Sequence, residues 1–245
     1  MSKAFEGKSV VITGGNSGIG LATAKRFASE GAKVFITARR EDELKKAALE
    51  IGHNAIAIPA DISKLSDIKR LFETVKKSTD KIDVLFANAG FMDLVKIGGI
   101  TEESYDKHFD VNVKGVVFTV QEALPLLKDG SAIILTSSIV SYKGFEGSTL
   151  YSATKAAVRS LARTWTSDLK SRRIRVNVVS PGPVTTPMSV GGMTLEGLNQ
   201  LGKQVPIGRV GTTDEIANVV YFLASDAASF IAGADIQADG GFTQI

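Results

Sequence analysis

The sequence contains no cysteine, and this absence excludes several kinds of chemistry. Without thiols the chain has no disulfides, no thiolate nucleophile and no cysteine-bound zinc. Histidine is scarce as well. The two histidines, His53 and His108, lie among polar neighbours in the sequence, outside the expected pocket, and their spacing from acidic residues suits no metal. We therefore expect no metal site.

Long apolar runs and blocks of like charge are also missing. No stretch approaches the ~20 apolar residues that a membrane-spanning helix needs. The first eight residues, MSKAFEGK, lack the apolar core of a secretory signal, so we expect a cytoplasmic protein with no membrane partner. The 29 basic and 26 acidic residues are scattered and give a net charge of only +3. This pattern is typical of a solvated surface and argues against nucleic acid as a partner.

What the sequence does contain is 245 residues with 44% hydrophobic content, enough for one large α/β domain. Short β-branched runs alternate with longer amphipathic segments, and the runs are apolar enough to be strands buried on both faces. The expected strands are 9–14, 33–37, 55–59, 82–87, 132–137, 174–180 and 235–239; the expected helices lie near 18–30, 41–51, 64–78, 102–127, 151–170 and 213–224. This alternation predicts one domain over residues 1–245, a doubly wound, seven-stranded parallel sheet flanked by helices.

One segment does not follow the alternation. Residues 187–206 are rich in glycine and methionine and contain no candidate strand. A long segment of this kind in a compact domain is either a mobile lid over a substrate site or an ordinary surface excursion, and both interpretations stay open.

A glycine-rich loop, TGGNSGIG (13–20), follows the first expected strand directly. Gly14, Gly18 and Gly20 lack a Cβ, which would let backbone N–H groups approach a phosphate at the start of the next helix. The loop has no G-K-[ST] sequence, so it is not the phosphate loop of nucleoside triphosphatases. Because turns need glycine anyway, the loop's position between strand and helix is the stronger part of this argument.

The end of the second expected strand bears on the choice of dinucleotide. Ala38 stands where an acidic residue would bond the ribose 2′-hydroxyl of NAD, and Arg39 and Arg40 follow it. Arginine can bind the 2′-phosphate of NADP through two hydrogen bonds. The sequence therefore favours NADP(H), unless both arginines simply pair with the acidic residues 41–43.

Tyr151 and Lys155 are four residues apart in a segment whose later apolar residues recur at helical spacing, so both lie on one helix face. A free phenol has a pKa of ~10, too high for acid–base work at neutral pH, and a nearby cation lowers it. The pair is therefore a candidate proton donor with its tuning charge, although such pairs also occur by chance.

The sequence resembles the short-chain dehydrogenase/reductase family, single-domain type, over essentially its whole length. The similar motifs are, in chain order, TGGNSGIG (13–20), Asp61 after the third strand, FANAG (86–90), Asn112 in VNVKG, Ser138, Tyr151 with Lys155, PGPVTT (181–186), GRVGTTDEIA (208–217) and ADGG (238–241). Ala87 stands where the family usually has an asparagine that supports the strand, which affects local rigidity more than activity.

The resemblance implies a Rossmann-type fold and roles for four catalytic residues. Tyr151 would be the general acid or base, and Lys155 would lower its pKa together with the positive nicotinamide of the oxidised cofactor. Ser138 would bond the substrate oxygen; Ser137 is adjacent, and the choice between them rests on the family's spacing. Asn112 resembles the residue that holds a water between Lys155 and solvent, or it is a plain polar residue that bends a helix.

The resemblance also implies a set of cofactor-binding residues around NADP(H). These are Gly14, Asn16, Ser17, Gly18, Ile19, Gly20, Arg39, Asp61, Ile62, Asn88, Ala89, Gly90, Tyr151, Lys155, Pro181, Gly182, Val184 and Thr186. Thr186 would orient the nicotinamide carboxamide, with Val184 packed nearby.

Apolar residues dominate the expected substrate pocket, with candidate walls at Phe91, Ile139, Val140, Tyr142, Phe145, Met188 and Met193. We therefore expect a ketone, an aldehyde or a secondary alcohol with an apolar flank. The alternatives are a sugar or polyol dehydrogenase of the same family and a non-catalytic sensor of NADP(H). Family members are usually dimers or tetramers, and the apolar stripe around Trp165, with the 102–127 helix, suggests paired helices between subunits.

Overall fold

Seven parallel strands form a single twisted sheet in the computed structural model, which describes residues 3–52 and 55–245. Their order across the sheet is β3-β2-β1-β4-β5-β6-β7, so the chain reverses its winding direction between β1 and β4. The strands are β1 (Ser9–Thr13), β2 (Lys33–Ala38), β3 (Ala55–Pro59), β4 (Ile82–Ala87), β5 (Leu127–Thr136), β6 (Arg175–Pro181) and β7 (Asp235–Ala238). The predicted doubly wound fold is confirmed.

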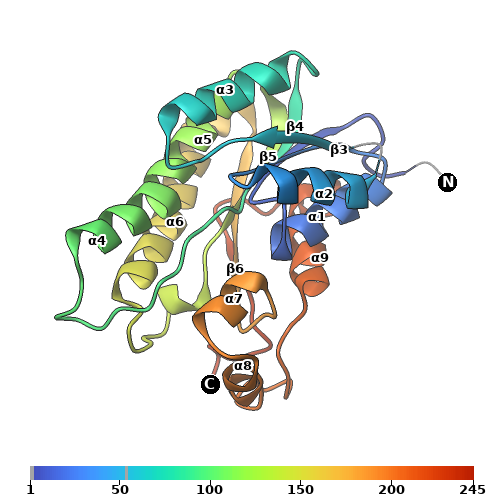
Figure 1. Cartoon of the computed structure of the whole chain (residues 1–245). Coiled ribbons are helices and arrows are strands. Elements are labelled where there is room, and N and C mark those ends of the chain that lie inside the picture. The colour runs from blue at the N-terminus through green and yellow to red at the C-terminus, as the bar shows by residue number, and fades with distance from the viewer. Residues whose placement is uncertain (1–2, 53–54) are drawn as a thin grey trace.

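Helices cover both faces of the sheet, as Figure 1 shows. Apolar side chains of α1 (Gly18–Ser29), α2 (Glu41–Ile51) and α9 (Thr213–Ala224) bury one face. Those of α3 (Leu65–Lys76), α5 (Gly115–Ala123) and α6 (Thr149–Asp168) bury the other. Helices cover both faces of the central strands, so the functional residues can gather only beyond the ends of the strands.

The predicted helix over 102–127 is interrupted. It consists of α4 (Glu102–Phe109), a π-helical turn at Asp110–Lys114 and α5, and β5 begins at Leu127, five residues earlier than predicted. The turn contains Asn112, whose side chain donates a hydrogen bond to the Phe91 carbonyl, outside the helix. A π-helical turn inserts one extra residue and frequently marks a functional site.

The segment over 187–206 forms two short helices, α7 (Pro187–Gly192) and α8 (Leu195–Gly202). Thr186 caps α7 by accepting a hydrogen bond from the Ser189 backbone, and Thr194 caps α8 in the same way. Both helices lie below the sheet in Figure 1, beside the end of β6. The segment is therefore locally ordered, and whether it moves as a lid stays a prediction.

The apolar stripe of α6 faces inward. Val158 and Ala162 are fully buried in the core, and Trp165 packs against it. Leu161, Trp165 and Leu169 of the same stripe stay partly exposed, and helix α4 packs against α6 within the chain. Whether these helices also pair between subunits stays a prediction. Across residues 3–52 and 55–245, no helix has the length and apolar character needed to cross a bilayer.

Candidate active site

The glycine loop follows β1 at the side of the sheet where the C-terminal ends of all the parallel strands lie, here called the carboxyl edge. The opposite side, with the N-terminal ends of the strands, is called the amino edge. Gly14 and Gly18 have φ values of 66° and 54°, which favour glycine. A Cβ on Gly20 would lie 2.1 Å from the Gly14 carbonyl oxygen, so no larger residue fits there. The first turn of α1 has no acidic residue, and no side chain caps its N-terminus. Its N–H groups are thus available to an anionic group, which suits a dinucleotide phosphate.

The end of β4 is tied to this loop. The Thr13 hydroxyl accepts hydrogen bonds from the backbone N–H groups of Asn88 and Ala89, both at 3.0 Å. In return, the Asn88 amide donates to the Thr13 carbonyl at 3.1 Å. These contacts bring the predicted cofactor residues 88–90 beside the glycine loop. Ala87, where the family usually has asparagine, is buried in the core at this point.

The two arginines after β2 have different surroundings. Arg40 pairs with Glu43 at 2.6 Å, and Glu43 also accepts a hydrogen bond from Asn16 of the glycine loop at 3.1 Å. Arg39 is exposed, and in the part of the chain that the structure describes it forms no ion pair. Pairing with the acidic residues 41–43 is therefore correct for Arg40 alone. Glu43 is a carboxylate beside the loop that the sequence pattern did not reveal.

Asp61 and Ile62 follow β3, farther along the same edge. The Asp61 carboxylate accepts hydrogen bonds from the backbone and hydroxyl of Ser63, at 3.0 and 2.8 Å. Ile62 is buried, and its carbonyl oxygen would lie only 2.7 Å from a Cβ on Gly115. The Asp61 carboxylate therefore has a fixed position within reach of the carboxyl edge.

The turn after β6 completes the cofactor set. A Cβ on Gly182 would lie 2.6 Å from the Asp239 backbone, so the Pro181–Gly182 turn packs directly on the chain after β7. Val184 pairs with Gly211 in an isolated bridge. A Cβ on Gly18 would lie 3.5 Å from Thr186, which places Thr186 against the glycine loop.

Lys155 and Asn112 converge beside Gly90. The Lys155 ammonium is buried and donates to the Thr136 carbonyl at 2.9 Å. A Cβ on Gly90 would lie 3.4 Å from Asn112 Oδ1 and 3.6 Å from Lys155 Nζ. This hydrogen bond from Lys155 to a backbone carbonyl could not be predicted from the sequence pattern.

Asn112 uses its whole side chain to hold its neighbours. Its Oδ1 accepts from the Phe91 N–H at 2.7 Å, and its Nδ2 donates to the Phe91 carbonyl at 2.8 Å and to Thr154 at 3.1 Å. The amide thus fixes the chain after β4 against α6, a role that the sequence did not suggest. Only one lone pair of Oδ1 remains for a water.

The two predicted proton-transfer groups have pKa values shifted by burial. Desolvation raises the pKa of Tyr151 to about 12, and a hydrogen bond with Ser138 partly opposes this. Desolvation also lowers the pKa of Lys155 to about 8. The ammonium lies 5.5 Å from the centre of the Tyr151 ring. Desolvation is the largest cause of the Tyr151 shift, and the expectation that Lys155, with the oxidised nicotinamide, lowers this pKa stays a prediction.

The structure distinguishes Ser138 from Ser137. Ser137 is buried, and its hydroxyl donates to the Lys155 carbonyl at 2.9 Å. Ser138 begins the short turn Ile139–Ser141 and interacts with Tyr151. Ser138 is therefore the serine that lies beside the phenol, as the family spacing implied.

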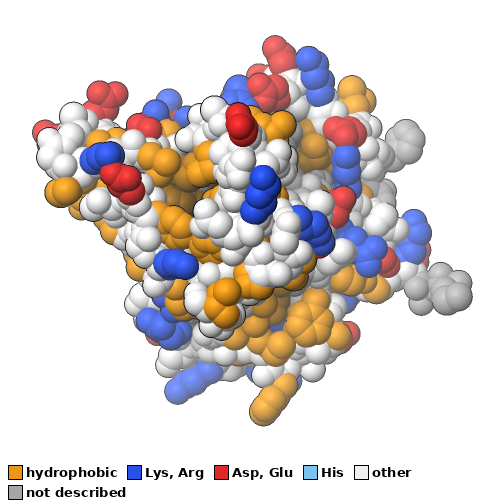
Figure 2. Space-filling view, turned by 90° about the horizontal axis from the view of Figure 1, so that it is seen from below, with side chains coloured by type: hydrophobic (Ala, Val, Ile, Leu, Met, Phe, Trp, Pro, Cys, Tyr) orange, Lys and Arg blue, Asp and Glu red, His pale blue; other side chains and the backbone are white. Residues whose placement is uncertain are grey.

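Only some of the residues predicted to line the substrate pocket lie together in the structure. Ile139, with Val140 beside it in the turn, packs in a small apolar cluster with Phe145, Leu201, Val205 and Phe242. Met188 and Met193 on the 187–206 segment are exposed. Tyr142 faces Arg159, whose Cζ lies 3.5 Å from its ring centre. Figure 2 views this edge from below and shows hydrophobic side chains lining a hollow.

His108 differs from expectation. It is fully buried, its ring packs on Phe91 with centres 4.8 Å apart, and Nδ1 lies 2.7 Å from the Ser104 carbonyl. It therefore supports a candidate pocket wall. His53 lies outside the described residues. Within 3–52 and 55–245, no three His, Asp or Glu residues are grouped as a metal site would require.

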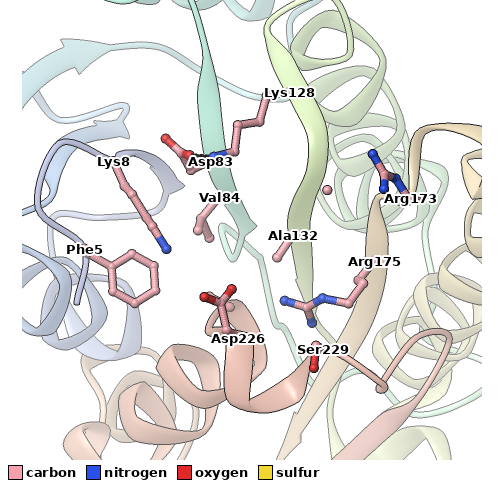
Figure 3. Close-up of a pocket in the computed structure, with 12 residues that line it drawn as sticks. Phe5, Lys8, Asp83, Val84, Lys128, Ala132, Arg173, Arg175, Asp226 and Ser229 are labelled. Atoms are coloured by element: carbon pink, nitrogen blue, oxygen red, sulfur yellow. Dashed lines mark ion pairs between the residues drawn. The ribbon is translucent and has the colours of Figure 1, made fainter.

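A separate cavity of about 220 Å³ lies at the opposite, amino edge of the sheet (Figure 3). Charged side chains surround it, including Lys8, Asp83, Lys128, Arg175 and Asp226. None of the predicted site residues lines it. The candidate active site is therefore the carboxyl edge, where the strand ends bring the predicted residues together.

Known proteins are similar to this chain along nearly its whole length. The sequence model of the family described as enoyl-(acyl carrier protein) reductase matches residues 14–243. The chain is 41% identical to the oxidoreductase asL5 of Sarocladium schorii over 98% of this chain and 97% of that protein. It is 35% identical to the NADP-dependent (R)-specific alcohol dehydrogenase of Lentilactobacillus kefiri, over 99% of each.

Solved structures give the same result. A Brucella melitensis protein described as a short-chain dehydrogenase/reductase and glucose/ribitol dehydrogenase superposes with a TM-score of 0.94 and 33% identity, covering 99% of each chain. Because similarity in sequence and in structure extends from end to end, the chain belongs to the short-chain dehydrogenase/reductase family and is an oxidoreductase.

Proposed function

We propose that this protein transfers a hydride between NADP(H) and a ketone or aldehyde, or the corresponding secondary alcohol, with an apolar flank. The observation that carries the proposal is the meeting of Ser138, Tyr151 and Lys155 next to the glycine loop. A pure binding protein has no physical need for a phenol, a hydroxyl and a buried ammonium together.

The residues around the loop suit a nicotinamide dinucleotide. The free N–H groups of α1 and the glycines 14, 18 and 20 would hold its phosphates, and Thr186 would hold the carboxamide. When bound, such a cofactor supplies or accepts the hydride. The protein's part is to hold the carbonyl and to manage the proton.

Proton transfer falls to Tyr151. With a pKa of about 12 the phenol is protonated at neutral pH, so it can donate its proton to the substrate oxygen as negative charge develops there. Ser138 would hydrogen-bond the same oxygen. Lys155, with a pKa of about 8, is mostly charged at pH 7 and would stabilise the phenolate left behind.

Arg39 supports NADP(H) over NAD(H). It is exposed at the end of β2, so it is available for a 2′-phosphate. The nearby carboxylate of Glu43 is paired with Arg40, which reduces its repulsion of a phosphate. Neighbouring structures include a Brucella reductase complexed with NADH and a metagenomic blue fluorescent protein complexed with NADPH, so the proposal rests on this chain's own arginine.

The apolar hollow at the carboxyl edge supports the substrate class. A sugar or polyol is the second candidate, because the chain is also 37% identical to the glucose 1-dehydrogenase of Gluconobacter oxydans. We further propose that the 187–206 segment closes over the substrate and that the protein is a homodimer or homotetramer. A monomeric mass in solution would contradict the oligomer.

The test is cofactor consumption with the full chain. NADPH and, in parallel, NADH are offered with aliphatic, aromatic and keto-ester carbonyls, and NADP⁺ with glucose and ribitol. Turnover of apolar ketones with NADPH is the expected result. Turnover of sugars alone would move the assignment to a polyol dehydrogenase, and NADPH binding with no turnover would favour the sensor.

A further inference from the structure

Arg159 lies on α6, two turns after Tyr151 and one turn after Lys155, so the three share one helix face. Its guanidinium makes three contacts. Nη1 donates to the Ser141 carbonyl at 3.0 Å, Cζ lies 3.5 Å from the Tyr142 ring centre, and Nε lies 2.8 Å from the Asp235 carboxylate. No sequence motif pointed to this arginine.

Two of these contacts hold the segment that contains Ser138, here named the serine turn (residues 137–142). The Ser138 carbonyl accepts a hydrogen bond from the Ser141 hydroxyl at 2.7 Å and from the Ser141 N–H at 3.1 Å. Ser137 also contacts the Ser141 hydroxyl, at 3.4 Å. A donor fixed on the Ser141 carbonyl therefore restrains the backbone that carries the Ser138 hydroxyl.

The third contact connects the serine turn with the cofactor side of the site. Asp235 begins β7, and its other carboxylate oxygen accepts from the Ser180 hydroxyl at 2.7 Å. Ser180 is fully buried and immediately precedes the Pro181–Gly182 turn. Arg159 and Asp235 thus join α6, β7, β6 and the serine turn in one cluster.

The chemistry of the pair suits positioning. The side chains of Arg159 and Asp235 are only 23% and 12% exposed, so their attraction is screened less than that of a surface pair. A planar guanidinium can serve a carboxylate, a carbonyl and an aromatic face at once, whereas an ammonium cannot. A side chain that only filled space would not need this geometry.

We propose that Arg159, anchored by Asp235, is a positioning residue that sets the location of the Ser138 hydroxyl relative to Tyr151. The inference rests on the proposed function, because the group being placed is the one assigned to the substrate oxygen. The three contacts of Arg159 are all with protein groups, so we assign it a positioning role and not a catalytic one.

The test compares Arg159→Met with Arg163→Met. Methionine can pack on Tyr142 but cannot hold the Ser141 carbonyl, and Arg163 is an exposed residue one turn further along the same helix. We expect kcat for ketone reduction to fall roughly 10- to 100-fold in Arg159→Met, because misplacing a reacting group by about 1 Å has effects of that size. The KM for NADPH should stay within about threefold, and Arg163→Met should resemble the wild type.

The pH profile separates positioning from general stability. A displaced Ser138 no longer offsets the high pKa of Tyr151, so the rise of alcohol oxidation with pH should shift to higher pH in Arg159→Met. Arg159→Lys should recover only part of kcat. A fall in kcat with an unchanged profile, or an unchanged kcat, would overturn the inference.

Amide hydrogen exchange over residues 137–142 gives a readout that does not depend on turnover. Faster exchange in Arg159→Met, with wild-type exchange in Arg163→Met, supports the restraint even if no carbonyl tested is a substrate. Wild-type exchange in both variants overturns it. Failure of the proposed function is recognised separately, by absence of turnover in the wild-type protein.

Discussion

The carboxyl and amino edges of the sheet differ in the number of charged side chains and in what these side chains contact. At the amino edge, charged side chains line a cavity, among them Asp83, Lys128 and Arg175 (Figure 3). Lys128 pairs with Asp83 at 2.5 Å, and Arg175 donates to two backbone carbonyls, those of Leu223 and Ser225. At the carboxyl edge, Lys155 is buried and donates a hydrogen bond to the neutral Thr136 carbonyl. The amino edge is rich in charge, whereas the site has one buried cation among hydroxyl groups.

The difference shows what kind of charge marks a functional site. The buried Asp83 carboxylate is paired with Lys128 and accepts a hydrogen bond from the Ser9 N–H, so its charge is compensated within the local structure. A buried cation without a carboxylate is costly: lowering the Lys155 pKa from 10.5 to about 8 corresponds to on the order of 3 kcal/mol of destabilisation at neutral pH. Such a cost points to a functional requirement.

The largest expected effect comes from removing the proton donor at the carboxyl edge. Tyr151→Phe should reduce kcat by roughly 10²- to 10⁴-fold, the usual contribution of a positioned general acid. NADPH binding, followed by fluorescence titration, should change little, because the ring remains. Undiminished turnover would show that the proton comes from elsewhere.

Replacing the buried cation should change how stability depends on pH. Because Lys155 has a lower pKa folded than unfolded, the unfolded chain binds more protons from about pH 8 to 10.5, and wild-type stability rises over this range. Relative to Lys155→Met, the wild-type free energy of unfolding should therefore increase by about 2 kcal/mol between pH 7 and pH 10.

The measurement is urea unfolding at each pH, with Lys8→Met as the matched substitution at the amino edge. A wild-type difference from Lys155→Met that stays flat across this range would contradict a desolvated Lys155. Between pH 7 and pH 10, the wild-type free energy of unfolding should not rise relative to that of Lys8→Met. An equal rise would show that the two edges do not differ in how they hold a lysine.

A smaller effect is expected from Arg39, an exposed residue at the carboxyl edge, on the KM for the cofactor. Arg39→Ala should raise the KM for NADPH by about 10-fold, the value of one charge-assisted contact to phosphate, and leave the KM for NADH unchanged. Arg40→Ala is the control, because its guanidinium is bound to Glu43. Equal effects of Arg39→Ala on the two cofactors would remove the argument for NADP(H).

The smallest effect belongs to the amino edge. Arg173, which lines the cavity, is the non-glycine residue with positive φ, at 53°, among the described residues. Arg173→Gly should relieve this conformation and raise the free energy of unfolding by at most about 1 kcal/mol, since glycine's added freedom in the unfolded chain offsets part of the gain. Turnover should not change; a loss of turnover would give this edge a functional role.

The sequence predicted the parts of the site that depend on strand ends. Carboxyl ends of parallel strands share one edge, so the glycine loop, Asn88, Ser138 and Thr186 could be expected to meet there. Spacing also predicted that Tyr151 and Lys155 share a helix face. These features follow from local pattern and topology together.

Other features could not be predicted because they depend on packing. The break between α4 and α5 follows from Asn112 bonding to Phe91, a contact between separate elements that periodicity does not show. The raised Tyr151 pKa reflects burial, and the Arg40–Glu43 pair reflects side-chain direction. The two helices within 187–206 were missed because glycine masks helical periodicity.

The hydroxyl of Thr13 has a consequence for how the protein acquires activity. It binds backbone groups 75 and 76 residues away, and Arg159 reaches Asp235 across a similar stretch of chain. Contacts of such long range are completed late in folding, after much of the entropy of loop closure has been lost. A partly unfolded chain that lacks these contacts therefore lacks a complete site, and activity reports that β1 has joined the end of β4 and that α6 has joined β7.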